Sequence, residues 1–153
     1  MRKNNLSLIV FAAVMGVSNI SFAADAKTVS GANCQPKSDE YNIDRNYMGH
    51  ARNISSSIQR WTCPIVRDSM APNLSRAEMK IINATGTMSC TLYSRSSSGG
   101  HVSGVTRSTA LSGGSVQTLS WPAIADANNG YYYFRCRVPA GSRVISYYWN
   151  ERT

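Results

Sequence analysis

The stretch GYYYFRCRVP, residues 130–139, holds the densest group of side chains that could bind a ligand. Three consecutive tyrosines precede a phenylalanine, and two arginines flank a cysteine. Aromatic rings can stack on the apolar faces of sugar rings. The planar guanidinium group of arginine can hold carboxylate, sulfate or phosphate with two hydrogen bonds. The stretch therefore predicts a surface for a ligand that combines ring faces with negative charge.

A β-strand would sort these side chains, because successive residues of a strand point to opposite faces. The apolar set, which carries the cysteine, belongs in the core: Tyr132, Phe134, Cys136 and Val138. The other set should face outward: Tyr131, Tyr133, Arg135 and Arg137. In residues 87–95 the same pattern turns Cys90 inward, so Tyr93 and Arg95 should extend the outer surface. The alternative is that Tyr–Arg contacts only stabilise an exposed sheet.

Groups suited to catalysis are sparse. There is no GxSxG motif, and only His50 and His101 could act as histidine bases. His101 lies in SSGGHVSG, which has the composition of a solvated loop tip. No two carboxylates are placed as a glycosidase pair would be. We therefore expect no enzyme activity and no cofactor, with a calcium site in SDEYNID (38–44) as the alternative.

The N-terminus has the pattern of a bacterial secretory signal. Arg2 and Lys3 precede an apolar run at residues 6–17 that is short for a membrane span, and Ala23 ends a small-residue cleavage site. We assign residues 1–23 to the signal peptide. A cut after Ala26 and an uncleaved anchor are the alternatives. Residues 24–153 then form one domain with 14 basic and 8 acidic residues, a net charge of +6.

Four cysteines, Cys34, Cys63, Cys90 and Cys136, remain after the signal peptide. An even number in an exported chain predicts two disulfides, and the absence of a CxxC motif argues against zinc. Three pairings are available. We favour Cys34–Cys63, which would tie the N-terminal arm down, and Cys90–Cys136, which would join two strands of similar pattern.

Short runs with period-two alternation recur along the chain, separated by Gly-, Ser- and Asn-rich turns. They lie at residues 57–65, 76–83, 87–95, 115–121, 130–138 and 143–150. Six to eight such strands predict an all-β antiparallel β-sandwich or jelly roll. In the last strand we expect Ile145, Tyr147 and Trp149 to point inward. Residues 38–57 should include a loop or short helix, and Asn129-Gly130 predicts a hairpin.

Three stretches, TCPIVRD (62–68), SCTLYSR (89–95) and GYYYFRCRVPAGSRVISYYWNE (130–151), resemble a group of small exported bacterial proteins of unknown function. That group shares a Cys-Pro after the first paired strand, a mid-chain strand with Cys, and a late Tyr-rich strand with Cys, followed by Pro and a closing strand that ends near Glu. The resemblance implies a β-sandwich with two disulfides. It implies no activity, substrate or site residue.

The sequence thus favours a secreted or periplasmic, non-catalytic binding protein. The leading hypothesis is recognition of an extracellular or cell-surface polysaccharide, including an anionic one, through the outward Tyr and Arg side chains. One alternative is a structural protein of the envelope or matrix that self-assembles through sheet edges. Another is an inhibitor or toxin that binds a protein. We expect no nucleic-acid partner and no membrane span after cleavage of the signal.

Overall fold

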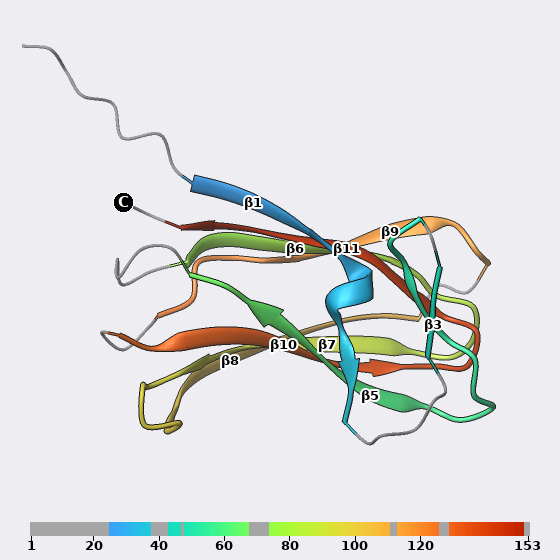
Figure 1. Cartoon of the computed structure of the whole chain (residues 1–153), viewed down its shortest axis with the longest axis horizontal. Coiled ribbons are helices and arrows are strands. Elements are labelled where there is room, and N and C mark those ends of the chain that lie inside the picture. The colour runs from blue at the N-terminus through green and yellow to red at the C-terminus, as the bar shows by residue number, and fades with distance from the viewer. Residues whose placement is uncertain are drawn as a thin grey trace, which may run out of the picture.

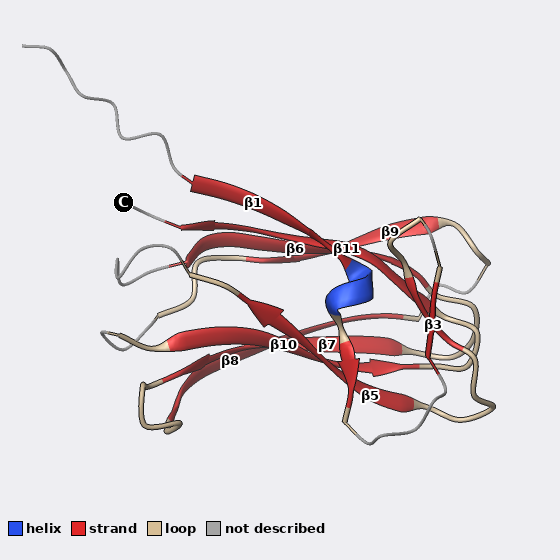
Figure 2. Ribbon diagram, viewed as in Figure 1, coloured by secondary structure: helices blue, strands red, loops and turns tan. Residues whose placement is uncertain are grey.

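Two antiparallel β-sheets pack face to face and enclose the core (Figure 1 and Figure 2). The computed structural model describes residues 25–37, 43–46, 48–67, 74–110, 113–125 and 129–151. Within these ranges nearly all regular structure is strand, so the predicted all-β sandwich is confirmed. The signal peptide predicted at residues 1–23 lies outside the described residues.

Each sheet is named here by its central strand. The β11 sheet has the order β3 (Ile43–Arg45), β4 (Ala51–Asn53), β11 (Arg143–Glu151), β6 (Leu74–Ile82) and β9 (Val116–Trp121). Strand β1 (Asp25–Ser30) pairs with the C-terminal part of β11, on the same side as β4. The β10 sheet has the order β2 (Gln35–Pro36), β5 (Gln59–Ile65), β10 (Tyr131–Val138), β7 (Met88–Arg95) and β8 (His101–Thr109). A short 3-10 helix, η1 (Gly31–Asn33), carries the chain from β1 to β2, between the two sheets.

The core lies between the sheets and consists of every second residue along the strands, the ones whose side chains point inward. In β10 the predicted inward set of Tyr132, Phe134, Cys136 and Val138 is buried. Three tryptophans, Trp61, Trp121 and Trp149, are among the largest fully buried side chains. Burying this many aromatic rings contributes much of the hydrophobic stabilisation of a domain of this size.

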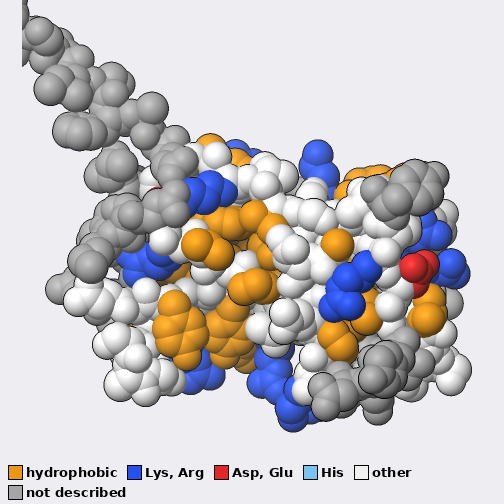
Figure 3. Space-filling model, viewed as in Figure 1, with side chains coloured by type: hydrophobic (Ala, Val, Ile, Leu, Met, Phe, Trp, Pro, Cys, Tyr) orange, Lys and Arg blue, Asp and Glu red, His pale blue; other side chains and the backbone are white. Residues whose placement is uncertain are grey.

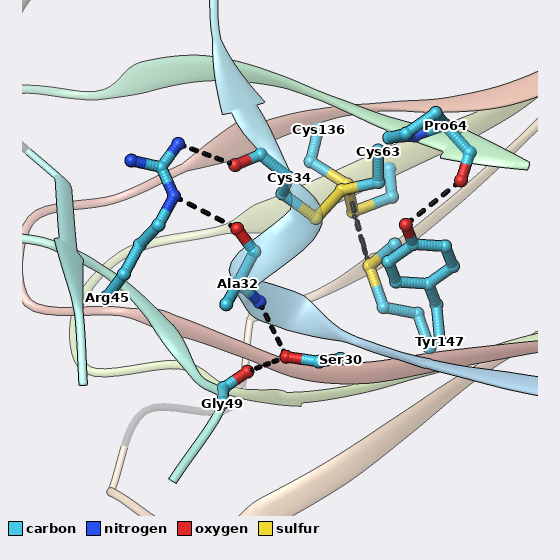
Figure 4. The surroundings of a disulfide bond; sticks show 11 residues. Ser30, Ala32, Cys34, Arg45, Gly49, Cys63, Pro64, Cys136 and Tyr147 are labelled. Carbon is cyan, nitrogen blue, oxygen red and sulfur yellow. Dashed lines mark hydrogen bonds between the residues drawn. A yellow bond between two sulfur atoms is a disulfide. The ribbon is translucent and has the colours of Figure 1, made fainter. Parts of the chain in front are cut away.

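Both disulfides have the favoured pairing and lie in the β10 sheet. Cys90 of β7 stands directly opposite Cys136 of β10, and their Cα atoms are 4.0 Å apart. Cys34 follows η1 and is bonded to Cys63 of β5 (Figure 4). From the opposite sheet, the Met79 sulfur lies 3.5 Å from the Cys90 sulfur and 3.6 Å from the Cys136 sulfur. One bridge therefore joins β7 to β10, and the other joins the residue that precedes β2 to β5, both from the core side of the β10 sheet.

Two regions that the sequence analysis assigned to loops contain strands instead. His101, expected at a loop tip, is the first residue of β8. This edge strand is exposed or half-exposed along its whole length, so its sequence shows no apolar alternation. Between residues 38 and 57 the described part contains β3 and β4, which are three residues each and too short to show a period.

The inward face of β11 differs from the expectation at one residue. Tyr147 and Trp149 are buried as predicted, but Val144 is buried and Ile145 is only half-buried. The register with β6 shifts between Val144 and Ser146. An extra residue in one strand at such a bulge reverses the alternation that precedes it.

The predicted hairpin at Asn129-Gly130 is wrong. Asn129 does adopt the left-handed conformation of a turn, with a φ of 62°. However, the preceding strand β9 pairs with β6, whereas the following strand β10 pairs with β5 and β7. The chain therefore passes from one sheet to the other at this point, and the turn does not join paired strands.

Tyr147 links the sheets and makes stability sensitive to alkaline pH. Its side chain is 1% exposed, and its hydroxyl donates a 2.9 Å hydrogen bond to the Pro64 carbonyl (Figure 4). Burial raises the pKa of Tyr147 from 10.0 to about 12. Between these values the folded state keeps a proton that the unfolded chain loses. The free energy of unfolding should therefore be independent of Tyr147 titration below pH 10 and fall by about 1.4 kcal/mol per pH unit above it.

Urea unfolding at several alkaline pH values, for the wild type and for Tyr147→Phe, measures this effect. At neutral pH the free energy of unfolding of the variant should be about 1 kcal/mol lower than that of the wild type, because the variant lacks the hydrogen bond to Pro64. Above pH 10 its slope should be shallower than that of the wild type, since the other titrating groups are common to both proteins. Parallel slopes would mean that Tyr147 does not carry the pH dependence.

Candidate functional site

The outer face of the β10 sheet collects all six side chains singled out in the sequence. The antiparallel register places Tyr133 between Pro64 and Tyr93, and Tyr131 opposite Arg95. On the three central strands the outer face consists of Arg60, Thr62 and Pro64 of β5, Tyr131, Tyr133, Arg135 and Arg137 of β10, and Ser89, Thr91, Tyr93 and Arg95 of β7. One surface therefore carries an aromatic end and an arginine-rich end.

The aromatic end is a column of three tyrosines. The Tyr93 and Tyr133 rings are stacked, with centroids 5.2 Å apart and an angle of 23° between planes. The Tyr131 ring follows at 6.2 Å from that of Tyr133. The other end of the column leans over Gly104 of β8, where a Cβ would come within 3.2 Å of the Tyr93 ring. A side chain at Gly104 would therefore require the Tyr93 ring to shift by a few tenths of an ångström.

Much of the ring area in this column is used internally. Tyr133 touches a neighbouring ring on either side along the column, and both Tyr93 and Tyr133 are only half-exposed. Tyr131 is 44% exposed and ends the column. The ring face with most room for a ligand therefore belongs to Tyr131.

Arg95 holds the column together. Its Nε donates a 3.3 Å hydrogen bond to the Tyr133 hydroxyl, and its guanidinium carbon lies 5.4 Å from the centroid of the Tyr93 ring. A cation over an aromatic face is attracted by the ring's negative quadrupole. The Arg95 guanidinium group is thus engaged by the protein itself.

The arginine end surrounds a depression of about 290 Å³. Arg60, Arg135 and Arg137 line it, together with Ser89, Thr91 and Tyr93. In the part of the chain that the structure describes, none of these three arginines forms an ion pair or a side-chain hydrogen bond. Their guanidinium donors are therefore available to a ligand.

Arg60 was missed by the sequence analysis. Alternation in residues 57–65 does place Arg60, Thr62 and Pro64 on one face of the strand and the buried Trp61, Cys63 and Ile65 on the other face. What the alternation could not show is that β5 is the neighbour of β10, with Arg60 directly opposite Arg137.

A second depression, of about 380 Å³, opens at the side of the sandwich where β1, η1 and β5 meet. In Figure 3 hydrophobic side chains gather on this side of the molecule, with Lys and Arg side chains around them. Arg45 lines the depression, but it donates to the Ala32 and Cys34 carbonyls at 2.9 Å and 3.2 Å (Figure 4). Tyr147, the aromatic residue in the lining, is buried. This depression therefore offers neither an open ring face nor an unengaged arginine.

Carboxylates are absent from the outer face of the β10 sheet, as far as the described strands go. Asp44, Glu78 and Glu151 all belong to strands of the β11 sheet. Among the described residues no three His, Cys, Asp or Glu side chains are grouped as metal ligands. His101 packs edge-on against Tyr93, with ring centroids 5.9 Å apart. The alternative calcium site at residues 38–44 lies mostly outside the described residues.

No described helix is long and apolar enough to cross a membrane. Two disulfides fit a chain that folds in an oxidising compartment.

No protein-family model and no curated protein sequence matches this chain. Similar solved structures include the C-terminal CBM6 of LamC, a laminarinase from Zobellia galactanivorans (TM-score 0.55, 10% identity, 83% of this chain and 100% of that one). The low affinity xylan binding module CBM86 from Roseburia intestinalis has a TM-score of 0.52 at 8% identity, over 84% of this chain and 96% of that one. The Podospora anserina GH26-CBM35 β-(1,4)-mannanase has a TM-score of 0.51 at 13% identity. That match covers 84% of this chain and 28% of the mannanase chain. At these identities the likeness shows a common β-sandwich fold.

Proposed function

We propose that this chain is a secreted, non-catalytic protein that binds a polysaccharide through the outer face of the β10 sheet. The observation that carries the proposal is a column of tyrosines that ends in the exposed Tyr131, beside arginines that have no described partner, on one face. The fold supports it, since it is shared with a xylan binding module and with CBM6 of a laminarinase. The pattern of a signal peptide and the two disulfides support export.

Binding would use the two ends of the face differently. The Tyr131 ring would stack on the apolar face of a sugar ring, as aromatic side chains stack on flat apolar groups. The arginines would add charge-assisted hydrogen bonds to anionic substituents. Tyr93, Tyr133 and Arg95 would keep the Tyr131 ring in place. No step of this scheme needs a nucleophile, a base or a metal.

Tyr131→Ala should weaken polysaccharide binding by about tenfold, because it removes the most exposed ring of the column. Its melting temperature should stay close to the wild-type value, since the ring is not part of the core. Tyr148→Ala is the matched control, because Tyr148 is half-exposed on β11, in the other sheet. Tyr133→Ala should also weaken binding without unfolding the domain, although it disturbs the stack that supports Tyr131.

The measurement is binding of the purified, oxidised mature protein to a panel of bacterial and plant polysaccharides, at low salt and at about 0.15 M salt. Selective binding that persists at the higher salt and depends on Tyr131 supports the proposal. Binding to every polyanion that vanishes with salt contradicts it, because screening removes interactions between exposed charges. Equal losses in Tyr131→Ala and Tyr148→Ala would also contradict it.

The structure disfavours self-assembly through one pair of sheet edges. Strands β8 and β9 end their respective sheets on the same side of the sandwich, and side chains bridge them. The Trp121 indole donates to the Val105 carbonyl at 2.8 Å, and Arg107 Nε donates to the Ser120 carbonyl at 3.1 Å. Edge carbonyls that already accept such bonds are less able to pair with a strand of another molecule.

A further inference from the structure

We propose that Arg60, Arg135 and Arg137 form a specific site for a tetrahedral oxyanion, a sulfate or phosphate ester carried by the polysaccharide. This inference rests on the proposed function for the identity of the carrier. It goes beyond it in naming the charged group and in adding Arg60, which lies on a different strand from the other two.

The register creates an arrangement of like charges that the protein itself does not compensate. Arg60 stands directly opposite Arg137 across the β5–β10 pair, and Arg135 lies two residues along β10 on the same face. Like charges directly opposite one another destabilise a sheet. All three side chains are exposed, and the described residues offer none of them a carboxylate partner. A bound anion would remove this repulsion.

The number of donors favours a tetrahedral ester over a carboxylate. One guanidinium group can satisfy both oxygens of a carboxylate with two parallel hydrogen bonds. Three guanidinium groups around one depression of about 290 Å³ supply donors for an anion with more acceptor oxygens. The Ser89 and Thr91 side chains line the same depression and add hydroxyl groups to it. A phosphate or sulfate monoester has three oxygens left to accept these bonds.

The distance between the two ends of the face defines the length of the ligand. Tyr131 and Arg137 are six residues apart on one strand, which corresponds to about 20 Å. A single sugar cannot reach both. A chain lying along β10 could stack one ring on Tyr131 and place the ester of a later unit among the arginines. A small inorganic anion would occupy the arginine end alone, which makes the two ends separable in experiment.

The first test is thermal unfolding of the mature protein with inorganic sulfate, inorganic phosphate, or sodium chloride at equal ionic strength. Sulfate or phosphate should raise the Tm of the wild type above its value in chloride, and the larger of the two shifts identifies the preferred ester. Sulfate and phosphate also stabilise folded proteins without binding to a site. Arg60→Gln should therefore reduce the difference to this non-specific part. Without the anion, the variant should unfold at the same temperature as the wild type or higher, because repulsion with Arg137 is relieved.

Arg52→Gln is the matched control, because Arg52 is an exposed arginine on β4 of the other sheet. It makes the same change in net charge but should leave the anion effect intact. The inference is overturned if sulfate, phosphate and chloride shift the Tm of the wild type equally. It is also overturned if Arg52→Gln and Arg60→Gln reduce the anion effect to the same extent.

The second test compares sulfated, phosphorylated, carboxylated and neutral polysaccharides. Arg60→Gln should weaken binding of the preferred ester-bearing polymer by about tenfold and leave the neutral and carboxylated polymers unchanged. Tyr131→Ala should weaken binding of every polymer that the wild type binds. Tyr131-dependent binding without any preference for an ester would overturn this inference and leave the proposed function standing. A specific anion effect on Tm without binding of any polysaccharide would support the anion site and overturn the proposed function.

Discussion

Replacing Cys90 and Cys136 together by alanine should lower the free energy of unfolding by about 4 kcal/mol. The bridge closes a loop with a sequence separation of 46 residues, so its loss restores considerable entropy to the unfolded chain. Both cysteines are fully buried, where they contact Met79 of the opposite sheet. Removing them also leaves space in the core, which adds to the loss.

Urea unfolding of the oxidised wild type and the double variant measures this loss. The matched comparison is Cys34→Ala with Cys63→Ala, which opens a loop with a separation of 29 residues and should cost slightly less, about 3.6 kcal/mol. Because β7 and β10 carry Tyr93 and Tyr133, the Cys90/Cys136 variant should also bind polysaccharide less tightly than the Cys34/Cys63 variant. Losses below about 1 kcal/mol in both variants would show that strand pairing and core packing alone hold the sheet.

Gly31→Ala should destabilise the fold by about 3 kcal/mol, the upper end for overpacking a core position. A Cβ at residue 31 would lie 2.0 Å from the Val144 carbonyl oxygen and 2.9 Å from that of Ile145. These are backbone atoms of β11, so no side-chain rotation can make room. Either η1 or β11 must move, and η1 is the connection that leads from one sheet to the other.

Gly86→Ala is the control for Gly31→Ala. Gly86 has a φ of 64°, and a Cβ there would meet nothing within 4 Å. The free energy of unfolding of that variant should fall only by the cost of placing alanine in the left-handed conformation, about 1–2 kcal/mol. Thermal or urea unfolding ranks the two variants. Because Cys34 directly follows η1, thiol titration after refolding should also find less complete oxidation in Gly31→Ala. If the two variants are equally stable, the close approach at Gly31 does not limit the fold.

Strand patterns with one buried face were predictable because burial imposes a period of two on the residues. This holds for β10, whose inward and outward sets follow the alternation in full. It also holds for β5 and β7, and the same alternation turned three of the cysteines toward the core. The favoured pairing of the cysteines was predictable for a related reason, since Cys90 and Cys136 occupy equivalent places in two strands of similar pattern.

Elements without one-sided burial were not predictable in this way. Strand β8 has no fully buried residue on either face, so HVSGVTRST shows no apolar alternation and resembles a loop. At the start of β11 a bulge reversed the alternation, and Val144 took the buried place expected for Ile145. At Asn129 the local conformation followed the sequence, but the partners of the flanking strands did not.

The candidate site shows the same division. Alternation within one strand determined which side chains leave the core, so Tyr131, Tyr133, Arg135 and Arg137 could be named from the sequence alone. Only the tertiary structure decided which strands flank β10 and in which register. That register stacks Tyr93 on Tyr133, engages Arg95 within the column and sets Arg60 opposite Arg137. The physical reason is that side-chain direction is a local property of the backbone, whereas strand neighbours are selected by the packing of the whole core.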